Sequence, residues 1–210
     1  MKKELIIIGA GNVGGFLALN QELFEQSFNI IGFLDDNENK IGKFFWGIEV
    51  LGTVDQITKY ENVHVAIGIS DPRVKKKIIS KIGSNYSYPN FVSKNAWISN
   101  EVTLGKGIII YPMVSINHET VIDDFVIINM NCAIGHNSVI EKCCSLAPNV
   151  SFGGFTHVES HVEIGIGSST IQQIRIGEGA VIGGQSMLIN NAEAHSVYSG
   201  IPAIKKKSLR

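Results

Sequence analysis

The feature that most constrains the fold is a hydrophobic period of six residues, which starts near residue 92. Steps of six from Val92 to Leu188 visit seventeen positions, and sixteen of them are apolar, Thr170 being the exception. Four residues beyond these positions the chain prefers small or β-branched types, such as Val126 and Cys132. Because a helix has about 3.6 residues per turn, it would spread this pattern around its whole surface. The period therefore excludes a helical bundle.

A period of six predicts a triangular solenoid, in which each unit is one short strand followed by one corner. Three units, or 18 residues, then close one coil, and the seventeen units make nearly six coils. The large apolar residue fills the interior and the small one fits a corner. Cys132 and Cys144 fall on the inward small positions, which favours a core role for both thiols. The period does not fix the hand of the coil.

The first 88 residues follow a different pattern, in which apolar runs rich in β-formers alternate with helical periodicity. The runs are "LIIIGAG", "NIIGFLDD" and "HVAIGIS", with helices expected through "FLALNQELFEQ" and "DPRVKKKIISKI". This alternation is typical of βαβ units on a mostly parallel sheet. The sequence thus predicts a Rossmann-like α/β domain over residues 1–88 and a solenoid domain with a C-terminal tail over 89–210. The stretch "GSNYSYPN", residues 83–90, is the expected linker.

Charge and cysteine content limit the classes of partner and compartment. Lys plus Arg number 18 against 19 Asp plus Glu, a net charge of −1, so no global field attracts nucleic acid or anionic lipid. We expect small molecules and further copies of the chain as partners. The three cysteines match no zinc spacing and favour a reducing, cytoplasmic setting. The apolar run near the N-terminus is too short for a membrane span, and we interpret it as a buried strand.

A glycine motif in the first domain indicates nucleotide binding. "GAGNVG" satisfies GxGxxG at Gly9, Gly11 and Gly14, and Asp35 follows 21 residues later, beside Asp36. This spacing matches a dinucleotide fingerprint, which keeps a small NAD-dependent enzyme open as an alternative. About 85 residues make only half of a dinucleotide fold. The length therefore favours one nucleotide over two.

Taken together, "GFLDD", "VAIG", "IGHNSVI" and the closing "SGIPA" resemble segments of the hexapeptide-repeat sugar acetyltransferases. The resemblance is to the sialic acid O-acetyltransferase and nucleotide-amino-sugar N-acetyltransferase type, and it spans about residues 4 to 204. It implies a left-handed parallel β-helix after the Rossmann-like domain. It also implies acetyl-CoA as the donor, no metal, and a homotrimer with the CoA cleft between adjacent β-helices.

The resemblance also assigns roles to single residues. His118 and His136 are 18 residues apart and should occupy one corner of successive coils, and the resemblance implies that His136 is the general base. Asn137 stands where relatives often carry a carboxylate, and Ser145 where they often carry a second histidine. The positions implied at the acetyl-CoA site are Ser145, Gly154, Ile166 and Gly184. Those implied at the nucleotide-sugar site are Asn12, Val13, Gly14, Asp35, Asp36, Ala66, Ile67 and Gly68.

The resemblance thus implies an acetyltransferase that acts on the amino group of a nucleotide-linked amino-deoxysugar of the UDP-4-amino type, in polysaccharide synthesis. A sialic acid O-acetyltransferase is the nearest alternative. A catalytically weak binding or scaffold protein also stays open, because Asn137 and Ser145 depart from the usual pattern. His157 and His161 have H-x3-H spacing, but four positions apart in a six-residue repeat lie on different faces, so we expect no zinc site there.

Overall fold

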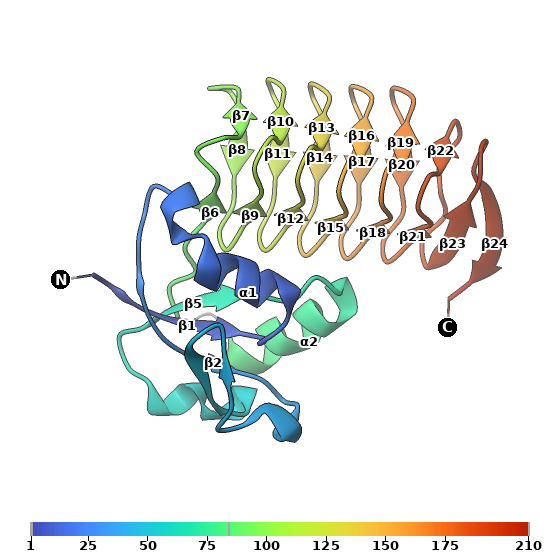
Figure 1. Ribbon diagram of the computed structural model, residues 1–210. Coiled ribbons are helices and arrows are strands. Elements are labelled where there is room, and N and C mark those ends of the chain that lie inside the picture. The colour runs from blue at the N-terminus through green and yellow to red at the C-terminus, as the bar shows by residue number, and fades with distance from the viewer. Residues whose placement is uncertain (1, 84, 210) are drawn as a thin grey trace. The chain divides into compact units, whose positions relative to one another are not determined.

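The computed structural model describes residues 2–83 and 85–209, and its contacts divide the chain into two compact units, Met1–Phe91 and Val92–Arg210 (Figure 1). The sequence placed this division at residue 88. The difference arises at β6 (Phe91–Val92), which belongs to a solenoid sheet and lies across the boundary. Among the described residues, no helix is long and apolar enough to cross a membrane.

The N-terminal unit contains a five-stranded sheet in the order β3-β4-β2-β1-β5. All neighbouring strands are parallel except β3 and β4, which form an antiparallel hairpin. The strands are β1 (Glu4–Ile8), β2 (Asn29–Leu34), β3 (Phe44–Phe45), β4 (Ile48–Gly52) and β5 (His64–Ile67). The last four residues of β1 are buried, as expected for a parallel strand that is covered on both faces.

The helices of this unit differ in part from the sequence prediction. They are α1 (Asn12–Leu19) and α2 (Pro72–Ile82), with short 3-10 helices η1 (Gln21–Leu23), η2 (Glu38–Lys40) and η3 (Val54–Lys59). The helix expected through "FLALNQELFEQ" ends early, because the Asn20 side-chain amide donates to the Phe16 carbonyl at 2.9 Å and closes the last turn. For α2, the Asp71 carboxylate accepts from the N–H groups of Arg73 and Val74 and caps the N-terminus.

The C-terminal unit is a solenoid of two-residue strands that recur every six residues (Figure 1). The strands are β7 (Trp97–Ile98), β8 (Thr103–Leu104), β9 (Ile109–Ile110), β10 (Ser115–Ile116), β11 (Val121–Ile122), β12 (Ile127–Ile128), β13 (Ala133–Ile134), β14 (Val139–Ile140), β15 (Ser145–Leu146), β16 (Ser151–Phe152), β17 (His157–Val158), β18 (Glu163–Ile164), β19 (Ser169–Thr170), β20 (Arg175–Ile176), β21 (Val181–Ile182) and β22 (Met187–Leu188). The tail adds β23 (Ser196–Ser199) and β24 (Ile204–Ser208), which pair antiparallel.

These strands form three sheets, which we call faces 1, 2 and 3. Face 1 carries β6, β9, β12, β15, β18 and β21 with the tail strands, face 2 runs from β7 to β22, and face 3 from β8 to β20. Neighbouring strands within a face are parallel and 18 residues apart, as in the pairing of Ile116 with Ile134. Three strands per coil and an 18-residue repeat confirm the predicted coil.

The interior follows the six-residue pattern closely. The second residue of most strands is buried in one continuous core, which includes Ile122, Ile140 and Ile164. Thr170, the one polar member, is accommodated because its hydroxyl lies 3.0 Å from the Thr156 hydroxyl and accepts from the Gly153 N–H at 3.1 Å. A buried hydroxyl with partners costs far less than an unpaired one.

The cysteines behave as core residues, as predicted. Cys132 and Cys144 are buried, and their thiols donate to the carbonyls of Ala147 and Glu159 at 3.2 and 3.0 Å. Burial raises the pKa of Cys132 to about 11, so its thiol stays protonated at neutral pH. A buried, protonated thiol is a poor nucleophile, which agrees with a packing role.

Candidate active site and nucleotide pocket

The corner between faces 2 and 3 collects the predicted catalytic histidine and its neighbours. His118 and His136 stack one coil apart, with ring centroids 5.3 Å apart and ring planes at 10°. The rings of His136 and Phe155 are nearly perpendicular, with centroids 5.2 Å apart and an interplanar angle of 84°. The two aromatic contacts fix the plane of the His136 ring, so that its nitrogens point in defined directions.

Gly154 continues this column on the next coil, where a side chain would block the imidazole. A Cβ atom built on Gly154 would lie 2.7 Å from His136 Nε2, closer than real Cβ contacts come. The absence of a side chain therefore leaves Nε2 accessible, and it allows a substrate to approach this nitrogen.

Asn137 holds the other ring nitrogen of His136. The Asn137 backbone has φ of 55°, in the left-handed region, and its Oδ1 lies 2.8 Å from His136 Nδ1. Its Nδ2 donates to Glu119 Oε2, on the preceding coil. The amide oxygen only accepts, so Nδ1 carries the proton and Nε2 keeps its lone pair. Sequence reasoning missed Glu119, although 137 − 119 = 18 places the two residues in one column.

The residues predicted for acetyl-CoA do not all lie at this corner. Ile166 and Gly184 form a column on a different corner, between faces 1 and 2, where the Ile166 side chain is 55% exposed. Ser145 lies on face 1, between Ile127 and Glu163 on the neighbouring strands. Within one chain, only Gly154 of this set lies beside His136.

The two histidines of the H-x3-H spacing contact separate carboxylates. His157 Nε2 lies 2.8 Å from Glu141 Oε1, and His161 Nδ1 lies 3.3 Å from Glu178 Oε1. Hydrogen bonds from His157 and Ser160 lower the pKa of Glu141 against the opposing effect of its burial. Among the described residues, no group of three His, Cys, Asp or Glu side chains is arranged to hold a metal ion.

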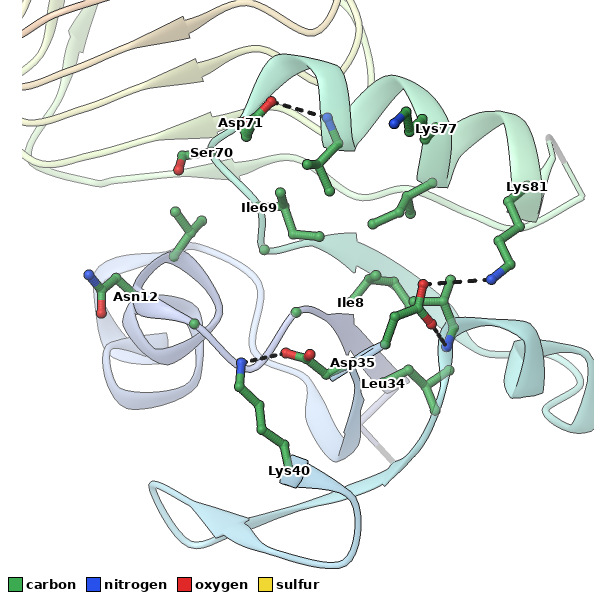
Figure 2. Close-up of a pocket in the computed structure, with 18 residues that line it drawn as sticks. Ile8, Asn12, Leu34, Asp35, Lys40, Ile69, Ser70, Asp71, Lys77 and Lys81 are labelled. Atoms are coloured by element: carbon green, nitrogen blue, oxygen red, sulfur yellow. Dashed lines mark hydrogen bonds and ion pairs between the residues drawn. The ribbon is translucent and has the colours of Figure 1, made fainter. Parts of the chain in front are cut away.

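The N-terminal unit contains a cavity of about 500 Å³ at the carboxyl ends of β1, β2 and β5 (Figure 2). This end of a parallel sheet is where α/β proteins bind ligands. Five predicted residues line the cavity: Asn12, Val13, Asp35, Asp36 and Gly68. The other three, Gly14, Ala66 and Ile67, do not line it.

Gly14 supports the cavity wall from behind. A Cβ on Gly14 would lie 2.1 Å from the Gly9 carbonyl oxygen, and one on Gly68 would lie 2.8 Å from Gly14 Cα. The three glycines therefore let α1, the loop after β1 and the end of β5 approach one another. The third glycine of a GxGxxG motif has this packing role in known folds.

Asp35 is held by three donors. Its carboxylate accepts from the backbone N–H groups of Ala10 and Asn37, each at 2.9 Å, and from Lys40 Nζ at 2.8 Å (Figure 2). Burial acts to raise the pKa of Asp35, but the hydrogen bonds from Lys40, Asn37 and Ala10 lower it below its usual value. Asp35 thus stays ionised and fixes the ammonium group of Lys40 at the rim of the cavity.

Asp36 and Lys81 form a second ion pair. Asp36 accepts from the Val54 N–H at 2.8 Å, and its other oxygen lies 3.6 Å from Lys81 Nζ. Lys81 also contacts Asp55 at 2.9 Å, and the hydrogen bond to Asp55 raises the pKa of Lys81. Lys40, Lys77 and Lys81 all line the cavity, and the sequence reasoning assigned none of the three to the site. Ammonium groups of this kind suit the phosphates of a nucleotide.

Comparison with solved structures identifies the fold. A point mutant of perosamine N-acetyltransferase from Caulobacter crescentus, in complex with CoA and GDP-perosamine, is 21% identical, with a TM-score of 0.88 over 98% of this chain and 97% of that one. The acetyltransferase domain of PglB from Neisseria gonorrhoeae, in complex with acetyl coenzyme A, is 21% identical, with a TM-score of 0.89 over 98% and 100%. WeeI from Acinetobacter baumannii is 25% identical, with a TM-score of 0.84 over 97% and 100%.

The chain therefore has the fold of the hexapeptide-repeat sugar acetyltransferases, with an α/β domain followed by a left-handed parallel β-helix, and this prediction from sequence is confirmed. Residues 4–82 match the family model of the PglD N-terminal domain.

Curated relatives match shorter segments. "Uncharacterized protein L142" of Acanthamoeba polyphaga mimivirus is 32% identical over 104 residues, which are 50% of this chain and 21% of that protein. The redox-sensing transcriptional repressor Rex of Desulforamulus reducens is 35% identical over 66 residues, 30% of this chain and 31% of Rex. The matched segment thus spans less than a third of either relative.

Proposed function

We propose that the protein transfers the acetyl group of acetyl-CoA to the amino group of a nucleotide-linked amino sugar, with His136 as general base. The observation that carries the proposal is the accessible Nε2 of His136, whose Nδ1 is held by Asn137 at 2.8 Å. The likeness to perosamine N-acetyltransferase and to PglB, over nearly the whole chain, supports the same reaction class.

In this reaction the sugar amine attacks the thioester carbonyl carbon while its proton passes to His136 Nε2. A C–N bond forms, and the tetrahedral intermediate then collapses with cleavage of the C–S bond. The imidazolium returns the proton to the CoA thiolate, so that CoA and the N-acetylated sugar leave. The Gly154 N–H is the proposed donor to the developing oxyanion, because a backbone N–H beside the reacting atoms stabilises charge without reorganisation.

The nucleotide moiety is assigned to the cavity of the N-terminal unit. Lys40, Lys77 and Lys81 are the proposed donors to the phosphates, while the aspartates that line the same cavity would accept from sugar hydroxyls or a base N–H. The sequence predicted a UDP sugar, whereas the perosamine enzyme was solved with GDP-perosamine. The test must therefore include both nucleotides.

A homotrimer accounts for the two separate corners. His136 and Gly154 lie on one corner of the prism, and Ile166 and Gly184 lie on another. Corners of a prism point in different directions, so a cleft lined by both columns requires a second copy of the chain. A closed ring of three copies supplies three such clefts. The cysteine thiols, which are buried, fit a reducing cytoplasm, where we place the protein.

The experiment mixes the protein with acetyl-CoA and follows thiol release with UDP- and GDP-linked 4-amino sugars, with free sialic acid in parallel. Turnover with an amino sugar alone supports the proposal. Turnover with sialic acid alone would identify an O-acetyltransferase, and no turnover with any acceptor would favour a binding or scaffold protein. Calorimetry with NAD tests the remaining alternative.

A further inference from the structure

Glu119 is a charged side chain near His136 to which the proposed mechanism gives no role. It lies on the coil before His136, in the same corner column as Asn137, and both residues adopt left-handed φ values, 53° and 55°. Asn137 Nδ2 donates to Glu119 Oε2, and Asn137 Oδ1 lies 2.8 Å from His136 Nδ1. The three side chains form one hydrogen-bonded chain that ends at the imidazole.

We infer that Glu119 is a positioning residue, which acts through Asn137 to fix the tautomer of the His136 imidazole and to support its charge during acetyl transfer. This inference rests on the function proposed above. In this inference the carboxylate comes from Glu119, on the coil before His136, and not from position 137, which directly follows the base.

The tautomer argument depends on what each group can donate. An amide can present either its oxygen or its nitrogen to a neutral histidine, so Asn137 alone would permit both tautomers. An ionised carboxylate only accepts, so Glu119 requires the NH₂ group of Asn137. The Asn137 oxygen then faces His136 Nδ1, which must carry the proton. Glu119 therefore leaves the lone pair on Nε2, the nitrogen beside Gly154.

The charge argument concerns the moment when Nε2 takes the proton. The imidazolium then lies two hydrogen bonds away from the Glu119 carboxylate, and hydrogen bonds that involve an ionised group are stronger than neutral ones. His118 stacks on the same ring and would oppose the imidazolium if it were itself protonated. Phe155 contacts the same ring and carries no charge. Glu119 is thus the negative group of this hydrogen-bonded chain.

The first test is Glu119→Gln, measured as kcat and KM over a range of pH. A glutamine can accept from Asn137 or donate to it, so both tautomers become available and the charge is lost. We expect kcat/KM to fall about tenfold, chiefly in kcat, and the acid limb of the profile to move to lower pH because the imidazolium loses support. Glu101→Gln is the matched control, since Glu101 is an exposed residue in the same column one coil earlier. We expect it to leave kcat/KM and the acid limb unchanged.

The second test moves the carboxylate. In the double variant Glu119→Gln with Asn137→Asp, the charge lies directly beside His136, and the new amide at position 119 can donate to it. We expect the double variant to regain most of the activity that Glu119→Gln loses, which a merely structural role for Glu119 would not produce. A single variant with wild-type rates and pH profile, or a double variant no better than the single, would overturn the inference.

A third measurement is independent of turnover. Nitrogen NMR of ¹⁵N-histidine-labelled protein identifies which ring nitrogen of His136 is protonated, with assignment by the His136→Ala spectrum. We expect the Nδ1–H form in the wild type and a mixture in Glu119→Gln. The same tautomer distribution in both proteins would reject the inference even if the natural acceptor were never found. Absence of acetyl transfer with the expected tautomers would instead reject the proposed function.

Discussion

At the scale of single residues, a missing side chain defines where chemistry can occur. Gly154 lies in the column above His118 and His136, and a Cβ at this position would come within 2.7 Å of the His136 Nε2 atom. The backbone φ of Gly154 is not in the positive region, so the main chain can accommodate an alanine at this position. Substitution at this position therefore tests access to Nε2 with little effect on folding.

The first prediction concerns this access. Gly154→Ala should lower kcat/KM about 100-fold. The new methyl group would push either the acyl group or the His136 ring away by about an ångström, and a misplacement of this size costs about that factor. His136→Ala should lower kcat/KM by about 10²–10⁴-fold, which is the usual contribution of a general base. Circular dichroism and thermal melting should show both variants folded. Wild-type turnover by His136→Ala would reject the assigned base.

The second prediction concerns the Asp35–Lys40 pair. The native pKa of Asp35 is lowered, so its interactions stabilise the fold above the unfolded pKa of about 3.9 and are lost as the pH falls through the native value. Asp35→Asn should therefore cost about 1–3 kcal/mol of unfolding free energy at pH 7, and the difference should shrink below pH 4. Urea unfolding at both pH values measures it, with the exposed Glu61→Gln as control. An equal cost at both pH values would contradict the role of the charge.

The third prediction separates the two domains. Asp35→Ala also removes the carboxylate partner of Lys40, whose ammonium group then keeps the weaker hydrogen bond to the Ala10 carbonyl at 3.1 Å. We expect the KM of the nucleotide sugar to rise more than the KM of acetyl-CoA. Steady-state kinetics with each substrate varied in turn decides this. An equal rise in both would contradict the assignment of the nucleotide to the N-terminal unit.

At the scale of elements, each two-residue strand of the solenoid has one inward and one outward residue. On β11, Ile122 is fully buried whereas Val121 is 39% exposed. The inward residues of successive coils make up the core, so the strand is held by its inward member. Each face adds one inward residue per coil, and on face 1 the outward residues of β9, β12 and β15 are buried as well.

The fourth prediction compares these two neighbours. Ile122→Ala should destabilise the protein by about 2–5 kcal/mol, because it removes buried methyl groups and leaves a cavity. Val121→Ala, on the same strand, should change stability by less than about 1 kcal/mol. Denaturant unfolding of both variants measures the difference. Similar losses in both would mean that the outward side is also buried in the native assembly.

The repeat explains why so much of the fold could be predicted. Each six-residue unit carries its own signal, so Ile122, Ile140 and Thr170 were all assigned to inward positions from spacing alone. Glu119 was not found, because its role depends on how the Asn137 amide is turned. The helix α1 was placed too far along the chain, since the apolar pattern continues past the cap at Asn20. Among the cavity lysines, Lys77 and Lys81 lie on α2 whereas Lys40 ends η2, and a single sequence gives no distance between these two elements.

At the scale of the whole molecule, the two corner columns bear on the proposed homotrimer. His136 and Gly154 belong to the corner between faces 2 and 3, and Ile166 and Gly184 to the corner between faces 1 and 2. In the proposed trimeric ring, the first corner of one copy would meet the second corner of the next. Each active site would then be shared between two chains.

The fifth prediction uses two inactive variants, His136→Ala and Ile166→Trp, co-expressed with different affinity tags. Hybrid trimers purified through both tags should contain about one intact site in three, because a ring of closed symmetry places one unaltered pair of corners at a boundary between the two variants. Thiol release by the hybrids, absent in either parent, measures this. Inactive hybrids would mean that one chain supplies the whole site.

The 18-residue coil also restricts how this protein can change in length. A single inserted residue between His118 and His136 would rotate everything after it by part of a turn, and inward and outward positions would exchange. A whole inserted coil would preserve that phase, yet it would carry Asn137 away from Glu119. The corner that carries His118 and His136 thus tolerates growth of the solenoid in complete coils at either end, but not between these two layers.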